Sequence, residues 1–249
     1  MKKAATLRIA LLAACLLALE AACRFGYVSQ LTIVPPSEMT TGLIAALGEA
    51  ETRTEIVTTL TGIACAALAS VSVGFLLGCL PRAWPRARTA LDPLLATYYS
   101  VPTFIFYPMF IVFFGMNRIP IVVIGFMFAF IAMMTSTMNG LDRVPPVLFR
   151  TARVHRMGTA ATIFRIVMPA AAPHLFSGVK LAIAYSFVGV LGAEFILSGS
   201  GVGYQIAFAF NGFDNQRMYA LILFVAIVIS SVNAVVLRCE RRLQRRIGR

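Results

Sequence analysis

Residues Arg143 to Pro173 read RVPPVLFRTARVHRMGTAATIFRIVMPAAAP, a basic segment with prolines near both ends. The sequence on either side is apolar over lengths that can cross a bilayer, for which a helix needs about 20 residues. A polar, helix-prone segment between two membrane helices is exposed to water, where a soluble protein can bind it. Residues 143–170 are therefore predicted to be a water-exposed segment that connects two membrane helices.

The composition indicates an integral membrane protein. Of the 249 residues, 59% are hydrophobic and 13% are charged, whereas soluble domains average about 25% charged residues. With a mean hydropathy of +0.83, the chain has too little polar surface to cover a globule in water. We predict an all-α, polytopic fold in which residues 1–249 form one membrane domain without a separate soluble domain.

The net charge of +12 and the five cysteines both suit a membrane protein. The basic residues lie in short loops between apolar runs, and no loop offers a contiguous basic face that could follow nucleic-acid phosphates. The cysteines form no CxxC pair and lie in or beside apolar runs, where cysteine behaves as a small hydrophobic residue. We expect no nucleic-acid binding, no metal site, no cofactor and no required disulfide.

Six apolar runs predict six transmembrane helices, with the basic segment between the fourth and the fifth. The predicted helices are residues 7–28, 56–80, 91–114, 119–138, 173–197 and 218–237. A cleaved signal peptide is the alternative for the first run, because LAAC at Leu12–Cys15 resembles a lipoprotein cleavage box. Arg8 leaves too short an apolar core before that box, so we favour a retained helix. Apolar residues at helical spacing in Met39–Leu47 predict a short helix at the membrane surface.

Three sequence features refine these runs. Pro93, Pro102 and Pro108 interrupt the third run, and such breaks are tolerated in a membrane only against other helices or a water-filled cavity. A GxxxG pattern that starts at Gly74 favours close helix packing in the second run. Residues 198–216 are rich in glycine and phenylalanine and are predicted to form a loop.

The distribution of lysine and arginine predicts the orientation. With six helices, both termini lie on one side, and 17 of the 22 Lys and Arg residues then lie on that side. The opposite side holds Arg24, Arg53, Arg118 and Arg217, and Lys180 lies within a helix. Because cytoplasmic loops carry the excess of positive residues, we predict that both termini and residues 143–170 face the cytoplasm.

Three ionisable residues within the predicted helices stand out. Glu20 is expected to lie at a helix end or to pair within the bundle, and Lys180 is expected to extend to the cytoplasmic interface. Glu194 lies near the outer end of the fifth helix and precedes the stretch SGSGVGY. We expect Glu194 to brace that stretch, with gating or lining of a pathway as the second interpretation and direct solute binding as the third.

Between its prolines, the basic segment predicts a cytoplasmic helix over Leu148–Ile166. Val154, Met157 and Ala161 recur there at helical spacing, with arginines between them. Such a helix could dock a partner through its apolar ridge and place the arginines against an acidic rim. It could equally rest on anionic lipid at the membrane surface. Physical reasoning alone leaves both interpretations open.

The segment resembles the cytoplasmic loop of inner-membrane permease subunits of bacterial ABC importers, in the binding-protein-dependent superfamily. That loop begins with a Glu-Ala-Ala triplet, has a glycine four residues after the last alanine, and ends in an aliphatic-x-Leu-Pro sequence. Ala152–Arg153 fits the start, Ile166–Pro169 fits the end, and Gly158 lies two residues late for the glycine. The glutamate, the first alanine and the glycine of the pattern are replaced by Arg150, Thr151 and Arg156.

Other stretches resemble the sulfonate, taurine and nitrate branch of the same family and follow the family's order. They are ALDPLLATYYSVP (Ala90–Pro102), YPMFIVFFGMN (Tyr107–Asn117), LDRVPP (Leu141–Pro146), GAEFILSGSGVGYQI (Gly192–Ile206) and the basic tail after the last helix. The resemblance covers about Pro35 to Arg246. It implies a type-1-like transporter core over about residues 52–240, with the helix at 7–28 as an N-terminal addition.

The resemblance implies a permease subunit in the bacterial inner membrane that moves a small solute from the periplasm to the cytoplasm. The implied partners are a cytoplasmic ABC ATPase subunit, a periplasmic solute-binding protein, a second permease copy in a homodimer, and membrane lipid. ATP hydrolysis would belong to the ATPase, so this chain is not expected to be an enzyme. It contains no GxxxxGK[ST] phosphate-binding motif.

The resemblance also assigns candidate site residues, none of them catalytic or metal-binding. The coupling loop would dock the ATPase through Arg150, Thr151, Ala152, Arg153, Val154, Arg156, Met157, Gly158 and Pro169. The candidates for an outer gate or pathway are Glu194, Ser198, Gly199, Gly201, Gly203 and Tyr204.

Two rival functions make different demands on the sequence. A membrane-embedded enzyme needs paired carboxylates, HExxH or a Ser/His constellation within the helices, and the sequence has none with catalytic spacing. A self-sufficient channel or secondary transporter, the alternative function, predicts midplane charges or inverted repeats, and the sequence has neither. The sequence leaves the solute open among small organic anions, sulfonates, pyrimidine-like or flavin-like vitamins and aromatic acids.

Overall fold

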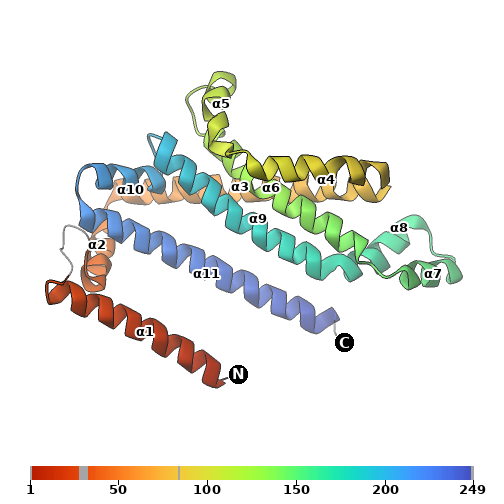
Figure 1. Cartoon of the computed structure of the whole chain (residues 1–249), viewed down its shortest axis with the longest axis horizontal. Coiled ribbons are helices and arrows are strands. Elements are labelled where there is room, and N and C mark those ends of the chain that lie inside the picture. The colour runs from red at the N-terminus through yellow and green to blue at the C-terminus, as the bar shows by residue number, and fades with distance from the viewer. Residues whose placement is uncertain (1, 28–32, 84, 248–249) are drawn as a thin grey trace. The chain divides into compact units, whose positions relative to one another are not determined.

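The computed structural model describes residues 2–27, 33–83 and 85–247. These residues form helices joined by turns, and none of them lies in a β-strand, which confirms the all-α prediction (Figure 1). The elements in chain order are α1 Lys2–Arg24, α2 Pro36–Gly48, α3 Ala50–Ala83, α4 Pro85–Ser100, the 3-10 helix η1 Thr103–Phe106, α5 Tyr107–Phe114, α6 Ile119–Asp142, α7 Pro146–Val154, α8 Thr159–Thr162, the π-helix η2 Ile163–Val167, α9 Met168–Leu197, α10 Val202–Asn211 and α11 Asn215–Ile247.

The chain forms two compact units. The first unit contains Met1–Thr58 and Glu194–Val228, and the second contains Thr59–Ala193 and Ile229–Arg249. Three long helices, α3, α9 and α11, contribute residues to both units. The first unit therefore holds α1, α2 and α10, and the second holds α4 to α8 with η1 and η2.

Among the residues that the structure describes, four helical stretches are long and apolar enough to cross a bilayer. They are Ala50–Pro81, Ile119–Asp142, Thr159–Leu197 and Asn215–Arg242. The shortest has 24 residues, which at a rise of 1.5 Å per residue span about 36 Å, against about 30 Å for the hydrocarbon core of a bilayer. The second, fourth, fifth and sixth predicted runs lie within these stretches and are confirmed as long apolar helices.

The third predicted run is divided among α4, η1 and α5. The α4 helix ends at Ser100, before Pro102, and α5 carries Pro108 in its first turn. Pro93 lies inside α4, so the prediction that it interrupts the run is wrong. A proline inside a helix removes one hydrogen bond and can bend the helix without ending it, whereas a proline in the first turn removes none.

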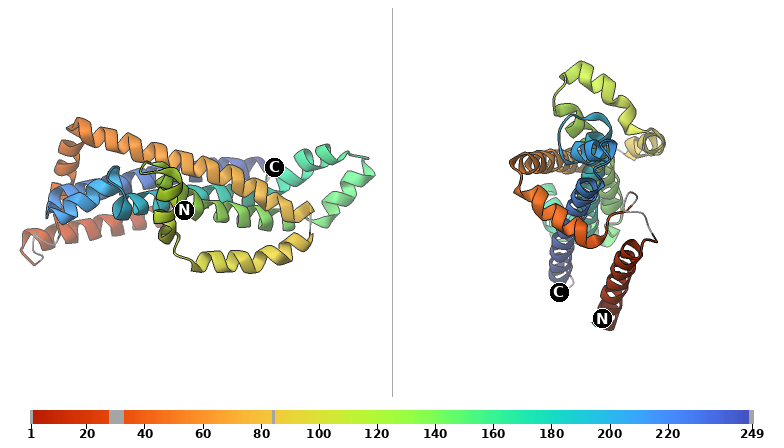
Figure 2. Two further views of the ribbon diagram at one scale, coloured as in Figure 1. Left: turned by 90° about the horizontal axis from the view of Figure 1, so that it is seen from above. Right: turned by 90° about the vertical axis from the view of Figure 1, so that its left-hand side faces the viewer.

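Small residues let three helices of the second unit approach closely (Figures 1 and 2). A Cβ atom placed on Gly74 of α3 would lie 2.5 Å from the backbone oxygen of Phe130 in α6. A Cβ atom on Gly125 of α6 would lie 2.5 Å from the side chain of Val190 in α9. The α6 helix therefore packs tightly against both α3 and α9, and the close packing predicted from the GxxxG pattern is confirmed.

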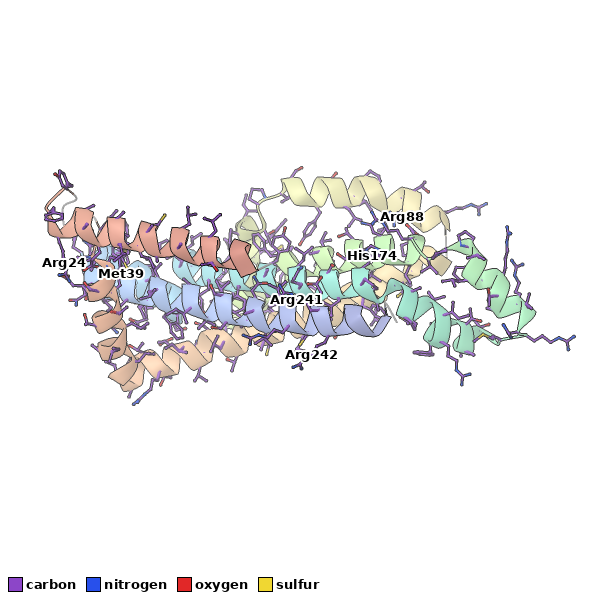
Figure 3. The ribbon with its side chains drawn as sticks, turned by 90° about the horizontal axis from the view of Figure 1, so that it is seen from below. Arg24, Met39, Arg88, His174, Arg241 and Arg242 are labelled. Carbon is purple, nitrogen blue, oxygen red and sulfur yellow. The ribbon has the colours of Figure 1, made fainter. Side chains whose placement is uncertain are left out.

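In the first unit, Glu20 joins α1 to α2. Its Oε1 accepts hydrogen bonds from Arg24 Nε at 2.7 Å and from the Ser37 hydroxyl at 2.6 Å, and its Oε2 accepts from the Ser37 backbone N–H at 3.0 Å. Glu20 therefore lies one turn from the end of α1, as the first of the two expectations has it, and it pairs with neighbours in α1 and α2. The short helix predicted at Met39–Leu47 is α2, and Figure 3 labels Arg24 on α1 and Met39 on α2.

Residues 198–216, predicted to be a loop, contain the helix α10. The prediction is therefore wrong for Val202–Asn211. Only Gly203 of the local glycines lies inside α10, whereas Gly201 and Gly212 flank its two ends. Glycine destabilises the interior of a helix but is well tolerated at its ends. The number of glycines in this stretch therefore led us to predict a loop where a helix forms.

Lys180 forms an ion pair within the second unit. Its Nζ lies 3.3 Å from Glu240 Oε2, and the two side chains are 32% and 17% exposed. The α11 helix continues to Ile247, ten residues beyond the predicted end of the apolar run at Leu237, and so brings Glu240 against α9 (Figure 3 labels the neighbouring arginines of this extension). Partial burial favours neutralising the ammonium group with a carboxylate.

The ion pair can be tested by reversing its polarity. Lys180→Glu should destabilise the protein by about 3 kcal/mol, because two partly buried carboxylates then face each other. The double variant Lys180→Glu with Glu240→Lys should regain most of this loss, since the pair forms again with the charges exchanged. Thermal unfolding in detergent measures both, and equal melting temperatures for the single and double variants would show that the residues do not interact.

Candidate functional site

The basic segment folds into a short helix, a tight reversal and a second helical stretch. The α7 helix begins at Pro146, where proline suits the first turn, and ends at Val154. After the reversal, α8 and η2 lead directly into α9 (Figure 1). The prediction of a single helix over Leu148–Ile166 is therefore wrong.

The reversal is a Schellman motif with Arg156 in the left-handed position. Arg156 has a φ of 49°, its N–H donates to the Arg153 carbonyl at 3.0 Å, and the Met157 N–H donates to the Ala152 carbonyl at 2.9 Å. This pair of bonds closes helix C-termini and is usually made around a glycine. Arg156 therefore adopts the backbone expected of the glycine in the family pattern, whereas Gly158 has a φ of −67°.

The α7 helix presents one mixed face to solvent. Val147, Arg150, Thr151 and Val154 are exposed, and their spacing of three and four residues places them on the same side of the helix. Val154 is 80% exposed, whereas Ala152 is 3% exposed. A row of apolar side chains with an arginine beside it suits an apolar cleft with an acidic rim on a soluble protein.

The inner face of α7 packs against the ends of α6 and α9. Leu148 and Phe149 contact a buried apolar cluster made of Leu141, Val144, Val167 and Ala171. Beside this cluster lies a cavity of about 540 Å³ with a mainly apolar lining, to which Arg153 and Met157 contribute. The α7 helix is therefore anchored on the ends of both neighbouring helices.

Pro169 lies inside the helical path from the loop to α9. It is the second residue of α9, and the π-helical turn Ile163–Val167 comes just before it. A proline cannot donate to the carbonyl four residues earlier, which here belongs to Arg165, and π turns commonly accommodate such a missing bond. The loop therefore joins α9 without an interruption of the helix.

The predicted outer residues lie around the N-terminus of α10, in the first unit. The Gly203 N–H donates to Glu194 Oε2 at 3.1 Å, and the Gly201 N–H donates to Glu55 Oε2. Glu194 is 3% exposed. Carboxylates from α9 and α3 thus converge on the start of a helix, where the unpaired N–H groups and the helix dipole favour negative charge.

The remaining predicted outer residues surround this point. The Ser198 hydroxyl donates to the Ser200 carbonyl at 2.8 Å and accepts from the Ser200 N–H at 3.1 Å. Gly199 is exposed with open space around it, and the Tyr204 ring lies 6.0 Å from that of Phe208. The structure therefore brings the six predicted residues together at one turn.

A second polar cluster in the same unit was not predicted. Arg217 Nη2 lies 2.9 Å from Glu49 Oε2, and donates to Thr52 Oγ1 at 3.3 Å and to Gln205 Oε1 at 3.5 Å. Gln205 Nε2 donates to Glu51 Oε1 at 3.2 Å. These contacts tie the start of α3 to α10 and α11 within the first unit, beside a cavity of about 360 Å³.

One sequence signal could have revealed this cluster. Glu51 and Glu55 stand four residues apart and therefore lie on one face of the first turns of α3. In the structure both carboxylates accept hydrogen bonds from the α10 region, Glu51 from Gln205 and Glu55 from Gly201. The partners are about 150 residues away in sequence, which is why the spacing alone did not identify them.

Comparison with known sequences identifies related proteins. Residues 70–249 match the family described as "Binding-protein-dependent transport system inner membrane component". The putative aliphatic sulfonates transport permease protein SsuC of Bacillus subtilis is 30% identical over 71% of this chain and 64% of its own length. The nitrate import permease protein NrtB of Leptolyngbya laminosa is 27% identical over 70% of this chain and 61% of its own length. The chain thus spans less than two thirds of these two relatives.

A further relative and two solved structures extend the comparison. The taurine transport system permease protein TauC of Escherichia coli is 23% identical over 87% of this chain and 80% of its own length. An inward-facing structure of the MetNI methionine ABC transporter has a TM-score of 0.64 at 16% identity, covering 78% of this chain and 99% of that chain. An amino acid ABC transporter with histidines has a TM-score of 0.55 at 14% identity, with coverages of 78% and 92%. These two structures share the fold.

The crowding at Gly201 gives a stability prediction with an internal control. An alanine Cβ at Gly201 would lie 2.2 Å from Glu194 Cδ, and the φ of 100° is already strained for any other residue. Gly201→Ala should therefore cost about 3 kcal/mol or more, whereas Gly199→Ala, with nothing within 4 Å, should cost less than about 1 kcal/mol. Thermal unfolding in detergent measures both, and similar losses for the two variants would contradict the geometry.

The Schellman motif predicts that one substitution has opposite effects at two neighbouring arginines. Arg156→Gly should stabilise the protein by about 1 kcal/mol, because relief of the left-handed strain exceeds the entropy that glycine loses on folding. Arg153→Gly, inside α7, should destabilise it by about 1 kcal/mol through lower helix propensity. Both remove one arginine, so melting temperatures that shift in the same direction would contradict the assignment of Arg156 to the left-handed position.

Proposed function

Because this chain belongs to the family of binding-protein-dependent transport system inner membrane components, we propose that it is the permease subunit of an ATP-driven importer. It forms part of the path by which a small solute crosses the inner membrane from the periplasm to the cytoplasm. Relatives named as permeases for aliphatic sulfonates, nitrate and taurine support this role. The four helices in the described part of the chain that are long and apolar enough to cross a bilayer support a membrane-embedded pathway.

The observation that carries the proposal is the construction of α7. Its outer face exposes Val147, Arg150 and Val154, and its inner face is packed onto the ends of α6 and α9. A helix that is exposed on one side and anchored on the other can accept a push from a soluble partner and pass it to two membrane helices. In this proposal residues 143–170 dock an ABC ATPase subunit, which hydrolyses ATP, while this chain supplies no catalytic group.

The proposed topology follows from the charges. Six membrane helices, with the apolar run at 7–28 as the first, place both termini and α7 in the cytoplasm and the start of α10 on the periplasmic side. The single membrane domain extends over residues 1–249, with its transporter core at about residues 52–240. A second copy of this chain completes the pathway, and lipid surrounds the pair.

The carboxylate cluster at α10 has a structural role in this proposal. Glu194 and Glu55 hold the start of α10 through backbone N–H groups, so they brace the outer end of the pathway without contacting the solute. A periplasmic solute-binding protein delivers solute to that side. The alternative function, a self-sufficient channel or secondary transporter, needs no docking helix and leaves the exposed face of α7 unexplained.

The docking role predicts which arginines an ATPase needs. In detergent extracts of native membranes, the wild type should copurify with an ABC ATPase, identified by mass spectrometry and by ATP hydrolysis. Reversing the charge at Arg153 and Arg156, or introducing Val154→Asp, should reduce the copurified ATPase at least tenfold, because both changes alter the exposed docking surface.

A matched control separates docking from net charge. Arg241→Glu with Arg242→Glu changes the net charge by the same amount at two exposed residues of the α11 extension (Figure 3). This control should keep the ATPase at the wild-type level. If no ATPase copurifies with the wild type, or if the control loses it equally, the docking proposal fails and the lipid-resting interpretation of the segment is favoured.

A further inference from the structure

A cavity in the second unit lies where the third apolar run is broken. The α4 helix ends at Ser100, Pro102 prevents its continuation, and α5 leaves in a different direction (Figure 1). The space beside this break has a volume of about 440 Å³. Small-molecule sites commonly measure about 300–1,000 Å³, so this cavity can hold one small organic solute.

The walls of the cavity are aromatic and held in place by the surrounding helices. The rings of Phe104 and Phe128 lie 5.1 Å apart, and a Cβ atom at Gly192 would lie 2.8 Å from the Phe104 ring, so the glycine makes room for it. The Tyr98 hydroxyl donates to the Met127 carbonyl at 2.8 Å, which fixes the ring of Tyr98. Rigid aromatic walls favour flat rings, which stack in offset or edge-to-face arrangements with centroids about 4.5–7 Å apart.

Residues that carry a hydroxyl group also line the cavity. They are Ser100 at the end of α4, Thr103 in η1 and Tyr185 in α9. A hydroxyl both donates and accepts a hydrogen bond, so these groups suit a ring with polar edge substituents. An apolar cavity with a few convergent polar groups is the usual form of a small-molecule site.

The lack of charged residues around this cavity indicates the class of solute that it can bind. The described residues that line it are uncharged, and the sequence has no charged residue between Pro93 and Asn117 or between Ile119 and Leu141. The ammonium group of Lys180 in α9 is already paired with Glu240 at 3.3 Å. Ser100, Val101 and Pro102 are exposed, so the cavity is open on one side. An anion bound against its apolar walls would lose part of its hydration without gaining a cationic partner, which is unfavourable.

We propose that this cavity is a transient binding site for an uncharged, flat aromatic or heteroaromatic solute that passes through the permease. The inference rests on the proposed permease function and adds the chemical class of the solute. It separates this chain from relatives named for aliphatic sulfonates and nitrate, whose solutes carry negative charge and lack an aromatic ring.

The test measures binding of matched probes to the full chain in lipid nanodiscs. Nicotinamide and uracil are uncharged planar heterocycles, while nicotinate and orotate carry a carboxylate on the same rings, and taurine serves as an aliphatic sulfonate. Equilibrium dialysis with radiolabelled probes should show saturable binding of nicotinamide or uracil. Nicotinate, orotate and taurine should bind at least tenfold more weakly.

Variants at the cavity connect the binding to this site. Ser100→Phe fills the space and should weaken binding of the neutral probe at least tenfold, whereas Thr97→Phe, at an exposed position of α4 outside the lining, should leave it unchanged. Ser100→Lys should shift the preference toward nicotinate or orotate, because it adds the missing cation. Absence of neutral binding, equal or tighter binding of the anions, or a wild-type affinity in Ser100→Phe would overturn the inference.

Failure of this inference can be distinguished from failure of the permease function. The same protein preparation is assayed for copurified ABC ATPase, which depends on α7 and not on the cavity. If the ATPase is present but the neutral probes do not bind, only the solute class is wrong. If the ATPase is absent while the neutral probes bind at Ser100, the cavity stands and the importer function is wrong.

Discussion

Backbone N–H and C=O groups in the hydrocarbon of a bilayer must find their hydrogen-bond partners within the protein, because no water is available there. This requirement makes the helix the default conformation along the apolar runs. Each place where a helix ends then needs other hydrogen-bond partners for the backbone groups that the helix no longer pairs. The α4 helix stops before Pro102, α7 ends two residues before a left-handed Arg156, and α10 starts after a left-handed Gly201. These interruptions coincide with an aromatic cavity, an exposed helix and a pair of carboxylates.

Two of these interruptions are stabilised by contacts with the residues around them. The reversal at Arg156 is closed by two backbone hydrogen bonds, and the apolar cluster around Leu141 and Val167 fixes the helices on either side of it. The start of α10 is held by Glu194 and Glu55, whose carboxyl oxygens accept hydrogen bonds from backbone N–H groups. The irregular backbone is therefore hydrogen-bonded and packed in both places. The proposed role of α7 in docking an ATPase requires such a firmly held helix.

Much of the fold could be predicted from sequence because hydropathy and helix length are local properties. The long apolar helices, the short α2 helix and the exposed basic segment all followed from them. The family resemblance placed a glycine-like position at Arg156, but composition alone gave no reason to expect an arginine in a left-handed conformation there. Pro93 and the glycines around α10 misled the prediction, because a proline or a glycine weakens a helix without always ending it.

Contacts between residues that are far apart in the chain could not be predicted from the sequence. Lys180 and Glu240 are 60 residues apart, and Gly201 and Glu55 are 146 apart. Charges alone suggest many such pairings, and helix packing selects among them. The candidate outer residues could be named together because they lie within one short stretch, whereas Glu51, Gln205 and Arg217 come from three separate helices and were missed.

The most direct test of the importer proposal is the membrane side of its two candidate regions. In a cysteine-free background, single substitutions Val154→Cys in α7 and Phe213→Cys after α10 place thiols at residues that are 80% and 87% exposed. A membrane-impermeant maleimide should label position 213 in spheroplasts and position 154 only in inverted vesicles. Labelling of position 154 from the periplasmic side would contradict the proposal, because no cytoplasmic ATPase could then reach α7.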